Sequence, residues 1–246
     1  FMYLKKISLS LLVIVLVLNS FSQKGASRYN PQFKFEPQKR ESVASANVTI
    51  ALLKPIFIDK EISRAGTPWD DFSIKMQTDI EEMLLAKGFK VRGPFNTRDE
   101  MVFNDKQNSD FTLEIGIDLS VDIQRDWKTV LALIGSNYLR VKKGNVNISS
   151  SVVMTAKSNF SGEKLWKKNI QLSQKNFSYT GDAKWSYKEI TFLNEFKEDN
   201  NLFNPISKQL EIIYSEALTV LWNQFDVNEM KGVANESKKE KAEQKQ

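Results

Sequence analysis

The chain has 246 residues, with neither histidine nor cysteine, and a formal net charge of +5 at pH 7. The commonest general base near neutral pH and the usual zinc ligands are therefore missing, which excludes serine–histidine catalysis, disulfide bonds and a thiol-linked lipid for this sequence. The charge is too weak and too scattered for nucleic-acid binding, which uses a concentrated basic surface.

Residues 1–22 have the pattern of a secretory signal peptide. Two lysines precede the apolar run 7–18, and Ser22 precedes a cleavage point before Gln23. An uncleaved membrane anchor is the alternative, although the run is shorter than the roughly 20 residues that span a bilayer. We expect an exported chain in the periplasm, at the outer membrane or at the cell surface of a bacterium, because a secreted protein without disulfides depends on its core alone. Peripheral association with a membrane is compatible with this interpretation.

The exported part is predicted to begin with a leader and a strand. Residues 23–46 are polar and are expected to form an extended leader, with Phe33 and Phe35 as anchors to the core. The segment "NVTIALLKPIFID" (47–59) predicts the first strand.

A long helix is predicted at 68–87. Thr67 is expected as its N-cap, Pro68 at the first helical position, and Gly88 as its stop. Its apolar residues recur every three or four positions and predict one buried stripe: Phe72, Met76, Ile80, Met83 and Leu84. A short strand at 89–93 and a short helix at 97–103 follow, the helix indicated by the capping-box spacing of Thr97 and Glu100.

Residues 110–123, "DFTLEIGIDLSVDI", alternate strictly between apolar and polar side chains. This pattern predicts a strand with one buried face and one wet face. The wet face carries three carboxylates, Glu114, Asp118 and Asp122.

A hairpin is predicted after this strand. Residues 145–173 indicate two strands joined across 158–163, where Gly162 supplies the permissive backbone of the turn. The preceding segment 127–144 is either a strand continuation or a loop with an apolar flap, and 177–201 is expected to be loop with a fragment of strand.

The chain is predicted to end in a helix and a charged tail. The helix is expected to begin at Asn204 and Pro205, and the tail at 226–246 is expected to be disordered from about Val227. The elements together predict a single α+β domain at 47–225, with a mixed, mainly antiparallel sheet and two long helices packed on one face.

The three carboxylates are the only acids arranged in a way that suggests catalysis. Residues four apart on a strand have backbones roughly 13 Å apart, whereas paired glycosidase carboxyls lie about 5 to 9.5 Å apart. The sequence also lacks phosphate-binding and dinucleotide motifs. A serine with a lysine base, or carboxylates with magnesium, remain open, but we interpret Glu114, Asp118 and Asp122 as the solvated face of a sheet and expect no enzyme, cofactor or metal site.

Ligand-binding candidates come from two other segments. Trp185 and Tyr187 lie in a polar stretch where an aromatic side chain meets a sugar or a partner, although covering one end of the sheet is the simpler role. Arg125, Lys128 and Thr129 follow the alternating strand, where a binding loop or merely a solvated strand end is expected.

Several segments resemble, in the same order, the neuraminyllactose-binding haemagglutinin family of bacterial surface lipoproteins. They are "IALLKPIFIDKEIS", "IEEMLLAKGFKV", "SDFTLEIGIDLSVDI", "SGEKL" and the closing helix 204–225. The resemblance implies a noncatalytic α+β domain at the cell envelope and an adhesin for sialylated glycans. The family is anchored through a cysteine that this chain lacks, and its Lys-Arg-Thr motif corresponds here to "QRDWKTV" (124–130), which retains Arg125, Lys128 and Thr129.

The leading hypothesis is an exported, noncatalytic envelope protein that binds another protein or a cell-wall component. An adhesin for sialylated glycans is the first alternative, and a carboxylate-dependent hydrolase is the second. No nucleic-acid partner is expected.

Overall fold

The structure, a computed structural model, describes residues 27–35, 44–131, 138–181 and 192–243, with the backbone alone described at 125–131 and 138–142. Its centre is a seven-stranded sheet in the order β3-β1-β4-β5-β6, in which β2 also pairs with β4 and β7 with β5. The strands are β1 (Thr49–Leu53), β2 (Ile56–Phe57), β3 (Lys90–Phe95), β4 (Phe111–Leu131), β5 (Tyr138–Lys157), β6 (Lys164–Gln171) and β7 (Lys175–Gly181). The pairs of β1 with β3 and β4 and of β2 with β4 are parallel, whereas β5 is antiparallel to β4, β6 and β7.

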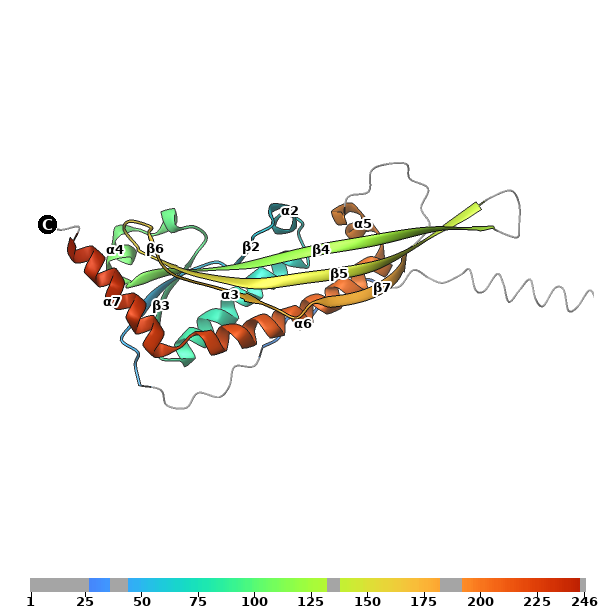
Figure 1. Ribbon diagram of the computed structural model, residues 1–246. Coiled ribbons are helices and arrows are strands. Elements are labelled where there is room, and N and C mark those ends of the chain that lie inside the picture. The colour runs from blue at the N-terminus through green and yellow to red at the C-terminus, as the bar shows by residue number, and fades with distance from the viewer. Residues whose placement is uncertain (1–26, 36–43, 132–137, 182–191, 244–246) are drawn as a thin grey trace, which may run out of the picture.

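Two long helices cover one face of this sheet, as predicted (Figure 1). They are α3 (Trp69–Ala86) and α6 (Asn200–Gln224), and the shorter helices are α2 (Lys60–Ser63), η1 (Arg98–Glu100), α4 (Phe103–Asn108), α5 (Phe192–Glu198) and α7 (Val227–Glu243). The α+β class and the packing of both long helices on one face are therefore confirmed. Among the described residues, no helix combines the length and the apolar character that crossing a membrane requires.

Strand β4 has the alternation that the sequence predicts. Its core-facing side chains from Phe111 to Leu119 at odd positions are at most 2% exposed, while Asp118 and Asp122 are exposed to solvent. The buried side chains of β4 share one core cluster with the apolar stripe of α3. The members of that stripe are fully buried: Phe72, Met76, Ile80, Met83 and Leu84. Each such side chain stabilises the fold by about 1.5–3 kcal/mol relative to an exposed one.

A buried polar contact joins the two long helices. The Tyr214 hydroxyl of α6 donates to the Asp79 carboxylate of α3 at 2.5 Å, and Lys75 reaches the other oxygen of Asp79 at 2.6 Å. Burial, together with the hydrogen bond to Asp79, raises the pKa of Tyr214, so the hydroxyl stays protonated and remains a donor.

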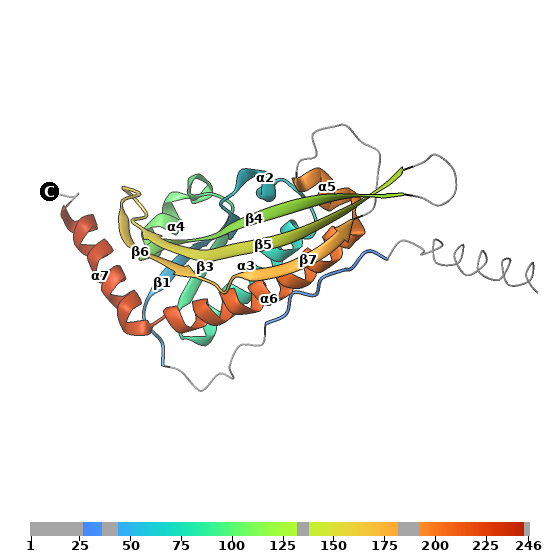
Figure 2. The ribbon, with the colours of Figure 1, turned by 45° about the vertical axis from the view of Figure 1, so that its right-hand side comes forward.

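The leader is fastened along α6 rather than free. The Tyr29 hydroxyl donates to Glu211 at 2.8 Å, and the backbone N–H of Tyr29 donates to the Asn204 side chain at 2.8 Å. The Phe33 ring is buried against Phe72 and Tyr214, with centroids 5.2 Å apart in each pair. Figure 2 shows this segment running beside α6. Phe33 is therefore the predicted anchor, and Phe35 packs partly buried against the same core.

The C-terminal interval predicted to be disordered instead forms α7. Met230, Val233, Ala234 and Ser237 are buried at helical spacing, so the charged sequence hides a short apolar stripe. The Glu229 carboxylate accepts hydrogen bonds from Trp166 at 2.9 Å and from Lys168 at 2.6 Å, and Ser237 donates to the Asp110 carbonyl at 2.5 Å. These contacts to the sheet supply the stability that the charged sequence alone does not.

Two helix starts differ from the prediction. Helix α3 begins at Trp69 with Pro68 as its N-cap, and no side chain caps it, although Gly88 ends it with φ of +85° as expected. Helix α6 begins at Asn200 with Pro205 inside its first turns, because the Asp199 carboxylate caps the Asn201 N–H.

Two further local predictions are also corrected. Thr97 makes no capping hydrogen bond, and the Glu100 carboxylate accepts instead from the Asn96 N–H at 2.9 Å. In the interval 177–201, predicted as loop with a fragment of strand, the strand fragment is the end of β7, whereas the described residues from 192 on form α5 and the start of α6.

Candidate functional site

The three carboxylates of β4 lie on the outer face, the face of the sheet opposite α3 and α6. Glu114 forms an ion pair with Lys157 of β5 at 2.7 Å. Asp118 and Asp122 are exposed, and among the described residues no group of three acidic side chains is arranged to hold a metal ion. These acids are spread along β4, and Glu114 is paired with a lysine of the neighbouring strand.

The outer face is covered at its β1 end, which the alternation alone did not predict. Thr112 is fully buried there and donates to the Asn159 side chain at 2.6 Å. Asn159 in turn donates to the Ser109 carbonyl at 2.8 Å, and Arg98 donates to the Phe160 carbonyl at 2.7 Å. The turn 158–163 is thus docked over this end of the sheet, so the open part of the outer face begins at Glu114.

A pocket of about 430 Å³ lies at the free edge of β4, between α2 and α5, and we call it the edge pocket. It is lined by Ile58, Asp59, Glu61, Ile62, Asp118, Leu119, Ser120, Val121, Phe192 and Leu193. Strand β2 pairs with β4 only at Gly116 and Ile117, and the Ile58 N–H donates to the Ile117 carbonyl at 2.9 Å. Beyond this bond, no described strand pairs with that edge of β4. The pocket therefore lies where β2 would continue if it were longer.

The backbone of β4 offers hydrogen-bonding groups to this pocket. In an antiparallel pair, a residue directs its N–H and C=O to the same side, and successive residues alternate. Since the Ile117 carbonyl meets Ile58, the N–H and C=O groups of Leu119 and Val121 point to the same free edge. An extended segment placed here would find the partners that a strand needs.

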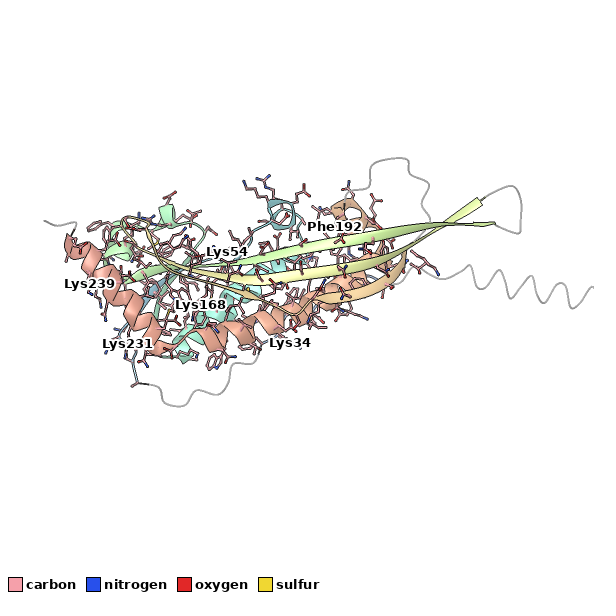
Figure 3. All side chains as sticks on the ribbon, viewed as in Figure 1. Lys34, Lys54, Lys168, Phe192, Lys231 and Lys239 are labelled. Carbon is pink, nitrogen blue, oxygen red and sulfur yellow. The ribbon has the colours of Figure 1, made fainter. Side chains whose placement is uncertain are left out.

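The side chains of the edge pocket are acidic and apolar. Asp59, Glu61 and Asp118 line it, and no lysine or arginine is found among the described residues of its lining. The Asp59 carboxylate is held in place because it caps α2, accepting from the Glu61 N–H at 2.7 Å and the Ile62 N–H at 3.0 Å. Phe192, labelled in Figure 3, contributes the apolar wall from α5.

A second pocket of about 360 Å³ adjoins the first, and Ile58 lines both. Ile58 is 47% exposed and covers Gly116, where an added Cβ would lie 3.0 Å from the Ile58 side chain. The second pocket contains Lys54 and Arg98 as well as Glu114, so its charges are mixed. A smaller pocket of about 90 Å³ is lined by Ser149, Ser150 and Ser151 together with Asp118, Ser120 and Gln171. Among the described residues that line it there is no lysine beside these serines.

Strands β4 and β5 continue past the rest of the sheet as a two-stranded projection, visible in Figure 1. We call residues 125–131 of β4 and 138–144 of β5 the hairpin arm, and its base at 142–144 still pairs with β7. The last pair between β5 and β7 is Lys142 with Gly181, whereas β4 and β5 remain paired up to Leu131 with Tyr138. Of the two alternatives for 127–144, the strand continuation holds for its described residues.

The predicted ligand-binding residues are divided between this arm and undescribed residues. Arg125, Lys128 and Thr129 lie on paired strand, opposite Gly144, Val141 and Arg140, and not on a loop. Arg125 and Thr129 share one face of the arm, while Lys128 occupies the other, because side chains alternate along a strand. Trp185 and Tyr187 lie outside the described residues.

Sequence reasoning missed the edge pocket and the concentration of charge on the arm. The pocket depends on Phe192 and Leu193 lying beside β4, which no local pattern indicates. The basic residues of the arm are separated in sequence and are brought together by the pairing of β4 with β5.

The fold and the pockets define an α+β sheet protein with an open outer face and a projecting hairpin. No protein-family profile and no curated protein sequence matches the chain. A solved structure described as a homolog of neuraminyllactose-binding hemagglutinin, from Helicobacter pylori, is 13% identical with a TM-score of 0.58, covering 86% of this chain and 100% of that one. At this identity the match shows a shared fold.

Two other solved structures match with lower TM-scores. Protein XCC0632 from Xanthomonas campestris is 11% identical with a TM-score of 0.34, covering 81% of this chain and 97% of that chain. Rare lipoprotein B from Shewanella oneidensis is 10% identical with a TM-score of 0.27, covering 70% of this chain and 92% of that chain.

Proposed function

We propose that this protein is an exported, noncatalytic protein of the bacterial envelope and that its edge pocket binds an extended segment of a protein partner. The observation that carries the proposal is the free edge of β4 beside the pocket, in line with β2. Recognition by strand addition uses main-chain hydrogen bonds for affinity and side-chain pockets for specificity. The signal-peptide pattern at 1–22 and the fold shared with a hemagglutinin homolog support the envelope assignment.

The lining of the edge pocket supports one chemistry for the partner. Three carboxylates favour lysine or arginine side chains, and the exposed Ile58 with Phe192 favours apolar ones. The partner segment is therefore extended, basic and partly apolar. A sialylated glycan, which carries a carboxylate of its own, would be repelled here.

The test uses two fluorescein-labelled peptides, one of alternating lysine and valine and one of alternating glutamate and valine. We expect the lysine peptide to bind, as measured by fluorescence anisotropy. Val121→Pro should weaken its binding at least tenfold, because proline removes a donor at the free edge and is tolerated on edge strands. Val121→Thr is the matched control, because it retains the N–H.

A charge variant gives a second measurement. Asp118→Asn with Glu61→Gln should weaken binding of the lysine peptide several-fold at low salt, while Asp122→Asn, on the same strand but outside the pocket, should not. Equal binding of the two peptides, or unchanged binding in Val121→Pro, would contradict the proposal. Mass spectrometry of proteins retained from native envelopes by the wild-type chain, but not by Val121→Pro, would then identify the partner.

Binding of sialylated glycans is the second candidate function, and the fold shared with the hemagglutinin homolog favours it. It would use the hairpin arm, where Arg125 and Thr129 share a face and arginine grips a carboxylate through two hydrogen bonds. A glycan array in which sialoside signals disappear in Arg125→Ala would support this function. An array without sialoside signals would exclude it.

A further inference from the structure

The hairpin arm carries most of the excess charge of the molecule. Its described strands contain five basic residues and one acid, Asp126; the basic residues are Arg125, Lys128, Arg140, Lys142 and Lys143. In the sequence, no acid occurs between Asp126 and Glu163. The same strands contain apolar residues at neighbouring register positions: Trp127, Val130, Leu131, Leu139 and Val141. Basic residues interleaved with aliphatic and aromatic ones are typical of surfaces that bind anionic lipid.

The opposite end of the molecule lacks this excess. Helix α7 contains four lysines and four glutamates between Val227 and Glu243. Figure 3 shows Lys231 and Lys239 on this helix, at the end far from the arm. The positive charge is therefore polarised along the long axis of the molecule.

The chain enters the fold at the base of the arm. Arg28, at the start of the described leader, lies 3.8 Å over the Phe203 ring and donates to the Lys197 carbonyl of α5 at 3.2 Å. In the same helix, Glu195 accepts a buried hydrogen bond from Tyr179 at 2.6 Å. Tyr179 of β7 is paired with Gly144, the residue at the base of the arm on β5. Figure 2 shows the leader and the arm reaching the same end of the molecule.

The geometry points to this end as a membrane-facing surface, and we propose that the hairpin arm binds a phospholipid bilayer with anionic headgroups. The charge and the apolar content of the arm carry this proposal, and the described leader enters the fold at the same end. A two-stranded ribbon is marginally stable by itself in water, and the last four pairs of β4 with β5 have no third strand among the described residues. Contact with a layer of lipid headgroups would add the stabilising interactions that a third strand does not supply here.

This proposal is independent of the edge pocket, which lies along the body of β4. The pocket is acidic and would be repelled by the same lipids. The two surfaces therefore allow the protein to hold a basic partner segment while its arm rests on the membrane.

The experiment measures partition of the chain from Gln23 to Gln246, which contains every described element, onto vesicles. One vesicle is phosphatidylcholine alone, and the other contains a quarter phosphatidylglycerol. We expect co-sedimentation with the anionic vesicles only, weakened by salt. Replacing Lys128, Arg140, Lys142 and Lys143 by glutamine should lower the partition about a hundredfold.

A matched variant controls for the loss of net charge. Lys60, Lys90, Lys231 and Lys239 are exposed and lie outside the arm, and their replacement by glutamine removes the same charge. This control should retain at least a third of the partition. Equal losses in the two variants would overturn the assignment to the arm.

A third variant and a competition experiment distinguish binding to the lipid layer from binding to free phosphate. Val130→Ser with Leu139→Ser leaves every charge in place at one cross-strand pair and should reduce partition about tenfold at high salt, where the apolar contribution dominates. Inorganic phosphate at millimolar concentration should not compete. Full competition by phosphate, or full retention of partition in both the charge and the serine variants, would contradict membrane binding by the arm.

Discussion

The edge pocket and the hairpin arm lie on the same strand, β4, but they are built in opposite ways. The pocket is assembled from three elements, so its carboxylates and apolar side chains sit on a packed body. The arm is held by the pairing of β4 with β5 and, at its base, by β7. The pocket is acidic and lies on the packed body, whereas the arm is basic and projects from it. The comparison teaches that a single long strand can carry two surfaces of opposite charge when one part of it lies within a packed body and the other part projects from it.

The largest expected effect is on the free energy of unfolding, when a substitution loosens α5, the helix that forms one wall of the pocket. Phe196 is 1% exposed, and its ring lies 5.4 Å from Trp69 and 4.7 Å from Phe203. Phe196→Ala should lower the free energy of unfolding by about 3–5 kcal/mol, as measured by urea denaturation. Hydrogen exchange should accelerate in α5 and leave the amides of the arm at 128–131 unchanged. Equal acceleration in both places would show that pocket and arm are one cooperative unit.

A smaller effect is expected at the base of the arm. An added Cβ at Gly144 would lie 2.4 Å from the Tyr179 ring, and that ring is held by its hydrogen bond to Glu195. Gly144→Ala should therefore cost about 1–3 kcal/mol through overpacking and reduce binding to anionic vesicles. Binding of the lysine peptide should stay within twofold of wild type, since Gly144 lies outside the pocket. A parallel loss of peptide binding would remove the distinction between the two regions.

The smallest effect concerns α7, which serves as a reference far from both regions. Burial raises the pKa of Glu229, but the hydrogen bonds from Lys168 and Trp166 outweigh it, so the pKa lies below the ordinary value of 4.5. A carboxyl with a lowered pKa stabilises the fold above pH 4.5, and this contribution is lost as the pH falls through the lowered value. Because the pair is partly exposed, Glu229→Gln should cost no more than about 1 kcal/mol.

The check for this contact is tryptophan fluorescence from pH 6 to 3, in which the difference between the wild type and Glu229→Gln reports on the surroundings of Trp166. The wild type should show an acid transition below pH 4.5 that is absent or weaker in the variant. Identical transitions would mean that the docking of α7 does not depend on this carboxylate.

The sequence predicted the packed half of the molecule better than the projecting half. The alternation of 110–123 and the stripe of the helix at 68–87 correspond to real burial, because one local period determines which side meets the core. Phe33 was also predicted correctly as an anchor, because an aromatic side chain in a polar leader gains most by packing against the core.

The errors have a common physical origin in contacts between distant segments. Thr112 follows the polar half of the alternation but is buried by the turn at Asn159, and the tail is ordered because Glu229 and Ser237 meet the sheet. The edge pocket needs α5 to lie beside β4, and the charge of the arm needs two strands to pair. Neither arrangement leaves a signal in any short window of the sequence.

The attachment of the leader along α6 fixes the direction in which the chain can be extended. A domain fused upstream of Ser27 would be carried next to the arm, because Ser27 accepts a hydrogen bond from Asn204 at 3.0 Å near the start of α6. A reporter fused after Glu243 would sit at the far pole, beside α7 (Figure 1). Two such fusions would therefore label opposite ends of the molecule, and together they would report how the protein is oriented in a cell.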